Sequence, residues 1–322
     1  MRRDTQQYGK ISAWLLLLFV LIVSGGCENR ADTLLLGGGP RGGSFQGVAE
    51  ELAGIINESI AGTTVSVRSS GGSEANLIKV SQGRLDLGLV YSGDAYLAEK
   101  FGLEENGQPL GNVTALARVY GGAAQLVVLN WSRIGSPYDL RGKRVAIGGS
   151  RSGTALSAKR FFSSLGIWQD IIPIHVGFAM AMEELIRGDV EAVWLLSGYP
   201  NEYLNNLSLG TALRHIELLE PARASGFFQA FPFYAEATIP AGTYNGQVLA
   251  VDTFQDAVLL VAHSRVDESL IYRVLGQIFN DRSLKRMHVR RPEAGDMSLG
   301  KGLEGVRIGL HAGAERFWTE SR

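Results

Sequence analysis

Hydrophobic residues along the chain alternate between the spacing of strands and the spacing of helices. A short apolar run at 33–36 is followed by Phe45, Val48, Leu52 and Ile56, which recur as on one face of a helix. The alternation continues, with strands expected at 64–68, 85–91, 125–130, 144–147 and 190–196 and helices at 74–82, 154–165 and 183–187. This β-α-β-α-β order predicts an α/β fold built on a mostly parallel sheet with helices on both faces.

Helix-boundary residues and chain length indicate how these elements are grouped. Ser73 is the expected N-cap of the helix at 74–82, and Gly83 and Gly166 are the expected C-terminal stops. A length of 322 residues favours two domains. No internal repeat or low-complexity linker separates them, so we expect the chain to cross between the domains more than once.

The N-terminus has the pattern of an export signal. A basic start is followed by an apolar segment at 11–23, which is too short to cross a bilayer, since that takes about 20 residues. The segment ends in Ser24, Gly25, Gly26 and Cys27, which is close to a bacterial lipoprotein signal. We expect residues 1–26 to be removed and Cys27 to be lipidated, which places the protein in the periplasm or cell envelope. An ordinary signal peptide, or an uncleaved anchor with an incidental cysteine, remains the alternative.

Charge and residue content exclude several classes of protein. The 31 Lys and Arg residues nearly balance 32 Asp and Glu, whereas nucleic-acid-binding proteins usually carry a basic excess. The one cysteine excludes an intramolecular disulfide framework and a Cys-based zinc site. The five histidines form no H-x-H or H-E-x-x-H pair, and no serine lies in G-x-S-x-G. No pattern therefore selects a metal site or a catalytic nucleophile.

Three glycine-rich turns are the main candidates for a binding site, at 37–44, 69–73 and 148–154. Each follows an expected strand and precedes an expected helix. The first turn of a helix has unpaired backbone N–H groups at the positive end of the helix dipole, which suits a carboxylate or a phosphate. The alternative is that these residues only turn and cap the chain. Three such turns favour a shared site, because the carboxyl ends of parallel strands meet at one edge of a sheet.

The first turn also satisfies G-x-G-x-x-G through Gly37, Gly39 and Gly42, the spacing of a dinucleotide site. Arg68, after the second strand, would suit a phosphorylated dinucleotide. However, no acidic residue ends that strand, and Pro40 removes a backbone donor from the turn. A dinucleotide-binding oxidoreductase is therefore the less favoured alternative.

An aromatic run, Phe227, Phe228, Phe231, Phe233 and Tyr234, has two possible roles. It can line an apolar pocket or form part of the core. We expect most of it to be core.

At the glycine-rich turns the sequence resembles the TAXI family of solute-binding receptors of tripartite ATP-independent periplasmic (TRAP) transporters. The resemblance runs from about residue 34 to residue 320 and rests on GGGPRGGSFQG (37–47), SSGGSEANLIKVSQGRLDLGLVYS (69–92), IGGSRSGT (147–154), ELIRGDVEAVWLLSGYP (184–200), YAEATIPAGTYNGQ (234–247) and IGLHAGAERFWTE (308–320). It implies a two-lobed periplasmic-binding-protein-like (type II) fold, each lobe a mostly parallel sheet with flanking helices. It also implies a receptor that closes on a small organic anion and delivers it to TRAP membrane permease subunits, with no enzymatic step and no cofactor.

The resemblance also implies lobes and a binding site. Lobe I is expected at 32–131 plus 247–322 and lobe II at 132–246, with the two connecting segments as a hinge. The expected ligand-binding residues are Gly42, Gly43, Ser44, Phe45, Gly72, Ser73, Asn76, Tyr91, Ser92, Arg151, Ser152, Gly153 and Thr154.

Several positions depart from the family pattern. Ser44, Phe45 and Gln46 stand where the family usually has Thr-Tyr-Tyr, Tyr91 replaces Gln, and Arg151 replaces the first Gly of Gly-Ser-Gly-Thr. We expect Arg151, and with it Arg41, to pair with ligand carboxylates, because a guanidinium can engage both oxygens. The alternative is that both side chains face solvent. The ligand class expected is a dicarboxylate or an acidic amino acid, and the alternative partner is a membrane sensor.

Overall fold

The computed structural model describes residues 32–41, 43–102 and 110–321, so the expected signal peptide and Cys27 lie outside the described residues. Contacts divide the chain into Met1–Asp32 and Thr33–Arg322, and the fold described below belongs to the second unit. Its sheet runs in the order β2-β1-β3-β10-β4-β7-β5-β6, with β8 beside β4 and β9 beside β10. The strands are β1 (Asp32–Gly37), β2 (Thr63–Arg68), β3 (Leu87–Tyr91), β4 (Val113–Leu129), β5 (Arg144–Ala146), β6 (Ile172–Ile174), β7 (Ala192–Ser197), β8 (Leu213–Ile216), β9 (Ala235–Ile239) and β10 (Val251–His263).

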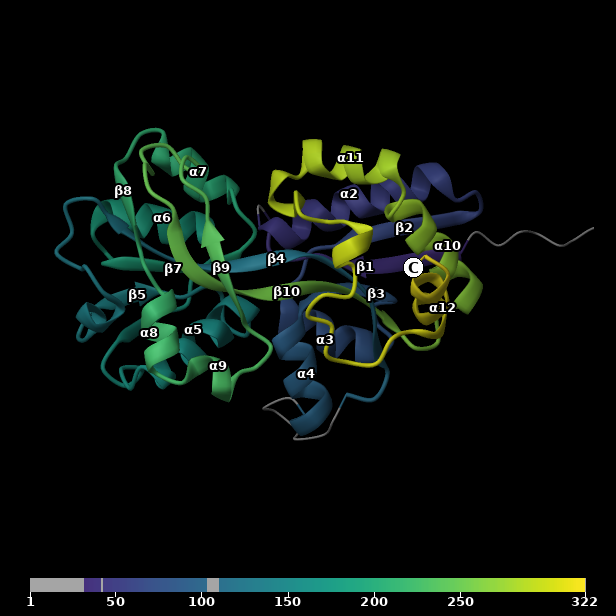
Figure 1. The fold of residues 1–322 in the computed structure, drawn as a ribbon, viewed down its shortest axis with the longest axis horizontal. Coiled ribbons are helices and arrows are strands. Elements are labelled where there is room, and N and C mark those ends of the chain that lie inside the picture. Colours follow the sequence, from purple (N-terminus) through teal and green to yellow (C-terminus); the bar gives the residue numbers. More distant parts are fainter. Residues whose placement is uncertain (1–31, 42, 103–109, 322) are drawn as a thin grey trace, which may run out of the picture. The chain divides into compact units, whose positions relative to one another are not determined.

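The sheet is parallel towards both ends and antiparallel in the middle. β1 pairs with β3 in parallel, and β5 pairs in parallel with β6 and β7. The long strands β4 and β10 run antiparallel to each other and to their neighbours β7 and β3. The expected α/β fold is therefore confirmed, and two long antiparallel strands, which were not expected, run between its parallel parts (Figure 1). We call these parts the β1–β3 end and the β5–β7 end.

Helices flank both ends of the sheet. In Figure 1, α2, α3, α4, α10, α11 and α12 lie around the β1–β3 end, and α5 to α9 lie around the β5–β7 end. Their bounds are α2 (Ser44–Ser59), α3 (Ser73–Ser81), α4 (Ser92–Phe101), α5 (Gly153–Ser164), α6 (Phe178–Arg187), α7 (Glu202–Ser208), α8 (Leu219–Ala224), α9 (Phe227–Ala230), α10 (Glu268–Ile278), α11 (Asp281–Arg290) and α12 (Ala312–Glu320). None of the helices in the described residues is long and apolar enough to span a membrane.

Most of the aromatic run belongs to the core, as expected. The Phe227 ring is fully buried and lies 5.5 Å from the Phe161 ring and 4.7 Å from the Phe254 ring. Trp194 of β7 stacks on Phe161 at 5.3 Å, so α5, α9 and β10 share one aromatic cluster. This cluster anchors α5, whose N-terminus contributes to the site described below.

The boundaries of α3 and β4 are among those that differ from the sequence expectation. The N-cap of α3 is Gly72, with φ of 103°, and Ser73 is the first helical residue. Glycine is favoured at this position because other residues rarely adopt such a φ. Strand β4 begins at Val113 rather than at 125, and nearly all of it is buried. A buried strand shows no alternation of apolar and polar residues, which explains why its first part was not predicted.

Candidate functional site

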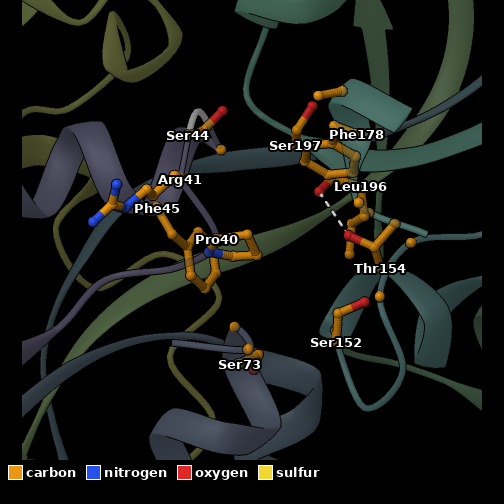
Figure 2. A pocket seen from close by; sticks show the side chains of 18 of the residues that line it. Pro40, Arg41, Ser44, Phe45, Ser73, Ser152, Thr154, Phe178, Leu196 and Ser197 are labelled. Atoms are coloured by element: carbon orange, nitrogen blue, oxygen red, sulfur yellow. Dashed lines mark hydrogen bonds between the residues drawn. The ribbon is translucent and has the colours of Figure 1, made fainter. Parts of the chain in front are cut away.

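A cavity of about 330 Å³ lies between the two ends of the sheet, and all three glycine-rich turns line it (Figure 2). The β1–β3 end contributes the turns before α2 and α3 and the end of β3, and the β5–β7 end contributes the segments before α5 and α6 and the end of β7. Its lining residues are Pro40, Arg41, Gly43, Ser44, Phe45, Gly71, Gly72, Ser73, Tyr91, Gly148, Gly149, Ser152, Gly153, Thr154, Gly177, Phe178, Ala179, Met180, Glu183, Leu196 and Ser197.

Four helix N-termini meet at this cavity. Helices α2, α3 and α6 begin after Gly43, Gly72 and Gly177, and none of these N-caps has a side chain that bonds the first turn. Helix α5 begins after Ser152, whose Oγ accepts one N–H of its own first turn at 3.1 Å. Apart from the N–H of Ala155, which Ser152 caps, and that of Gln46, which donates to the Gly43 carbonyl, the N–H groups at the start of these helices can bind an anion in the cavity.

Three buried hydroxyls in the wall are arranged as donors. Ser73 Oγ accepts from the backbone N–H of Tyr91 at 2.9 Å, and Ser197 Oγ accepts from the Gln125 amide at 3.2 Å. Ser152 Oγ accepts from the first turn of α5, as described above. Because each oxygen already accepts a hydrogen bond, each hydroxyl can donate its hydrogen towards the cavity.

The backbone carbonyl in this part of the wall is already bonded. The Leu196 oxygen accepts from the Tyr91 hydroxyl at 2.5 Å and from Thr154 Oγ1 at a longer 3.5 Å (Figure 2). Burial raises the pKa of Tyr91 well above its usual value, so the phenol stays protonated and donates. The hydrogen bond from Tyr91 also connects β3 to β7, that is, one end of the sheet to the other.

Glycines allow the two sides of the cavity to approach closely. A Cβ at Gly153 would lie 2.3 Å from a ring carbon of Tyr91 and 2.7 Å from a carboxylate oxygen of Asp94. A Cβ added at Gly72 would lie 3.8 Å from the Cβ of Ser152, so the N-termini of α3 and α5 lie close together. The Tyr91 ring, 4.9 Å from the Phe45 ring, packs where these elements meet.

Two charged residues, Arg41 and Glu183, are among the described lining residues. In Figure 2 the guanidinium of Arg41 is directed away from Thr154 and Leu196 on the opposite wall. Arg41 also lines a neighbouring cavity of about 430 Å³, with Glu50, Glu202 and Arg291 among its residues. Glu183 is exposed, and its carboxylate lies 3.7 Å from Arg187.

Three predicted site residues lie elsewhere. The Asn76 amide donates to the backbone carbonyls of Gly37, Gly38 and Leu89 at 3.2, 2.7 and 2.8 Å, so it supports the turn from behind. Ser92 Oγ donates to a backbone carbonyl of the C-terminal segment at 2.5 Å. Neither residue lines the cavity, because its polar group is bonded to the backbone.

Arg151, the third of these, also lies outside the cavity lining. It has φ of 63°, and its guanidinium lies 3.5 Å from the Glu74 carboxylate of α3. This ion pair links the two ends of the sheet beside the cavity. Of the other predicted residues, Gly42 lies outside the described residues, and the rest line the cavity: Gly43, Ser44, Phe45, Gly72, Ser73, Tyr91, Ser152, Gly153 and Thr154.

The segment at 177–183 and the pair Leu196 and Ser197 were not predicted as part of the site. Gly177 follows strand β6 and precedes helix α6, the same strand–glycine–helix order as in the predicted turns. Ser197 is the last residue of β7, at the carboxyl end of a parallel strand. Both signals were present in the sequence, but the helix was expected to begin only at 183.

A buried group of charges lies next to the cavity, on the other side of the Tyr91 ring. Asp94 of α4 pairs with Arg160 of α5 at 2.7 Å, and Arg160 also donates to the Tyr234 hydroxyl at 3.3 Å. Asp256 of β10 is fully buried and accepts from the N–H of Gly93 at 3.2 Å. Burial, reinforced by the negative charge of Asp94, raises the pKa of Asp256 well above its usual value. We call Asp94, Arg160, Tyr234 and Asp256 the Arg160 cluster.

Comparisons with known proteins show which of them share this architecture. The solved structures similar to it include a putative L-cystine ABC transporter from Listeria monocytogenes (TM-score 0.54, 16% identity, 83% of this chain and 98% of that one). They also include the periplasmic aliphatic sulphonate binding protein SsuA from Escherichia coli (TM-score 0.51, 16% identity, 90% and 84%) and a periplasmic transporter (0.52, 14%, 90% and 93%). At these identities the likeness shows a shared fold. The model of the NMT1-like family matches residues 36–321, and this chain therefore belongs to that family.

Proposed function

We propose that this protein is an extracytoplasmic receptor that captures a small organic anion in the cavity and delivers it to a membrane transporter. The observation that carries the proposal is the donor character of the wall. Ser73, Ser152 and Ser197 have hydroxyl hydrogens to donate, and four helix N-termini add backbone N–H groups. The Leu196 carbonyl already accepts twice. A ligand that supplies acceptors therefore fits this wall best, and an anion does so most strongly.

The proposal includes no chemical step. No histidine, lysine or cysteine is among the described residues that line the cavity, and the oxygens of Ser73, Ser152 and Ser197 accept from amide N–H groups. The alternative of a dinucleotide-binding oxidoreductase has less support, because Arg68 ends β2 where that site has an acid. Binding of a free dinucleotide to the purified protein would support this alternative instead.

Capture is proposed to work by closure of two lobes, 32–131 plus 247–322 and 132–246. Strands β4 and β10 lie within the first of these ranges but run on to pair with β7 and β9 of the second, with Gly121 and Gly122 of β4 opposite Ala257 and Asp256 of β10. Glycines there favour bending of the pair. A ligand that contacts both walls adds to the Tyr91 hydrogen bond and stabilises the closed arrangement.

The proposed partner is a TRAP-type permease, as the family resemblance implies, and attachment to the envelope through lipid on Cys27 is part of the same proposal. The structural likeness to proteins named for ABC transporters makes an ABC partner the direct competitor. A membrane sensor is the third possibility. Uptake of the ligand by vesicles that carry the partner distinguishes them: an ion gradient drives the first, ATP drives the second, and no uptake occurs with the third.

The binding proposal is tested with protein purified after export. Mass spectrometry of the small molecules that co-purify, followed by calorimetry with a panel of carboxylates, acidic amino acids and sulfonates, identifies the ligand class. A true ligand at 100 times its Kd raises the free energy of unfolding by about 2.7 kcal/mol. Absence of any co-purifying anion, together with no binding across the panel, would overturn the proposal.

A further inference from the structure

The charges around the cavity set a limit on the charge of its ligand. Arg41, the lining residue with a cationic side chain in the described part of the chain, turns its guanidinium away from the opposite wall (Figure 2). Arg151 lies outside the lining and next to Glu74. A ligand with two carboxylates would thus enter a site whose described lining directs no guanidinium at either of them. Removing a full charge from water without a partner is strongly unfavourable.

Donors for one anionic group are concentrated at one place in the cavity. The N-termini of α3 and α5 lie close together there, since a Cβ added at Gly72 would lie 3.8 Å from that of Ser152. Ser73, Ser152 and the first residues of both helices line the same cavity. Two helix N-termini with two hydroxyls can replace the hydration of one carboxylate or sulfonate.

The rest of the wall is mostly apolar. Pro40 and Phe45 cover one side, and Phe178 and Leu196 cover the other (Figure 2). The Phe178 ring comes within 3.9 Å of where a Cβ of Gly43 would lie, so it reaches towards the opposite wall. Such surfaces favour an uncharged, largely apolar body on the ligand. The hydroxyls of Ser44 and Ser197 can serve a neutral acceptor on that body, such as a carbonyl.

On the basis of the receptor function proposed above, we infer that the ligand is a monoanion: one carboxylate or sulfonate head at the N-termini of α3 and α5, and an uncharged apolar body between Phe45 and Phe178. This differs from the dicarboxylate class that the sequence resemblance suggested. The difference arises because the two arginines expected to pair with ligand carboxylates do not point into the cavity.

The test compares ligands of equal length and different charge by calorimetry on the exported, full-length mature protein. Hexanoate, hexane-1-sulfonate, adipate and hexanamide share one chain length, and shorter and longer members extend each series. We expect the best monoanion to bind at least about tenfold more tightly than the matched dianion and the matched amide, a difference of about 1.4 kcal/mol. Whichever of the matched carboxylate and sulfonate binds more tightly identifies the preferred head group.

Each result has a distinct meaning. Tighter binding of the dianions, or a dianion as the co-purifying molecule, overturns the inference and leaves the receptor function intact. If the panel does not bind but a small molecule co-purifies, its charge decides: a monoanion supports the inference. If no anion binds or co-purifies, the receptor proposal fails, and this inference fails with it.

Variants separate the head site from the arginine. Arg41→Ala should change the Kd of the best monoanion by less than about twofold, whereas Ser152→Ala, which removes a donor and the cap of α5, should weaken it about tenfold or more. Ser150→Ala, at a residue outside the lining, is the matched control. Unfolding of the ligand-free variants shows whether a loss of binding reflects a loss of folding. A tenfold loss in Arg41→Ala would overturn the inference.

Discussion

Two neighbouring contacts between the ends of the sheet use charge in opposite ways. In the Arg160 cluster, Asp94 of the β1–β3 end and Arg160 of the β5–β7 end pair at 2.7 Å with both side chains largely buried. In the cavity, the same two ends face each other mainly with hydroxyls, N–H groups and aromatic rings. Helix α5 takes part in both, with its N-terminus at the cavity and Arg160 further along.

The difference separates a structural contact from a binding contact. Where the chain supplies both charges, the contact is complete without a ligand, and removal of either partner is costly because it leaves a buried charge alone. Where the chain supplies donors only, the contact is completed by a ligand that brings the acceptors. Substitutions in the Arg160 cluster should therefore lower stability, whereas substitutions between the cluster and the cavity should affect both stability and ligand binding.

The largest effect is expected for Arg160→Met, which leaves Asp94 and Asp256 buried without a cation. The free energy of unfolding, measured by urea denaturation, should fall by about 3–5 kcal/mol. Arg141→Met is the control, because Arg141 pairs with Asp170 at 3.1 Å on the surface. That pair should contribute at most about 1 kcal/mol. Equal losses in the two variants would show that the cluster is not the structural contact described here.

The pH dependence of stability tests the second acid of the cluster. Because the pKa of Asp256 is raised in the folded state, folding retains a proton that the unfolded chain releases. The stability from this proton is present at low pH and is lost as the pH rises from about 4, the usual aspartate pKa, towards the raised value. As the pH rises from about 4 to the raised pKa of Asp256, the Asp256→Asn variant should therefore lose less free energy of unfolding than the original chain. Asp252→Asn, at an exposed carboxylate of the same strand, should keep the original slope, and an unchanged slope in Asp256→Asn would contradict the assignment.

How far the sequence predicted these regions depended on whether the signal was local. The turns before α2, α3 and α5 were recognised because glycine, serine and a following helical pattern stand next to one another in the chain. The contact of Tyr91 with Gly153 was not predictable in this way, because these residues lie on different ends of the sheet.

Side-chain direction was the second limit. A motif places Asn76 and Arg151 near a turn, but it does not show that Asn76 faces three carbonyls or that Arg151 lies next to Glu74. The direction of Arg41 is likewise visible only once α2 and its neighbours are packed (Figure 2). The fold class was therefore predicted well, whereas the balance of charge inside the cavity was not.

The boundary between cluster and cavity is tested by Gly153→Ala. The added Cβ would overlap the Tyr91 ring at 2.3 Å and approach Asp94 at 2.7 Å, so both regions must shift. Overpacking of this kind should cost about 1–3 kcal/mol of unfolding free energy and should weaken anion binding by calorimetry. Gly149→Ala is the matched control, since Gly149 also lines the cavity but its Cβ would have no atom within 4 Å. If both variants behave like the original chain, the close approach of α5 to Tyr91 is not required.

The smallest effect is expected for Tyr91→Phe, which keeps the ring and removes one hydrogen bond between the ends of the sheet. Loss of the 2.5 Å bond to the Leu196 carbonyl should lower the free energy of unfolding by about 0.5–1.5 kcal/mol. The carbonyl then retains only the 3.5 Å bond from Thr154 and presents an acceptor to the cavity. Because an acceptor repels an anionic head, the best monoanion should bind less tightly, while the matched neutral amide, which can donate to the carbonyl, should lose less or gain. An equal loss of affinity for both ligands would mean that the Tyr91 hydroxyl only holds the two ends of the sheet together. Its hydrogen bond to the Leu196 carbonyl would then have no effect on which ligand the cavity prefers.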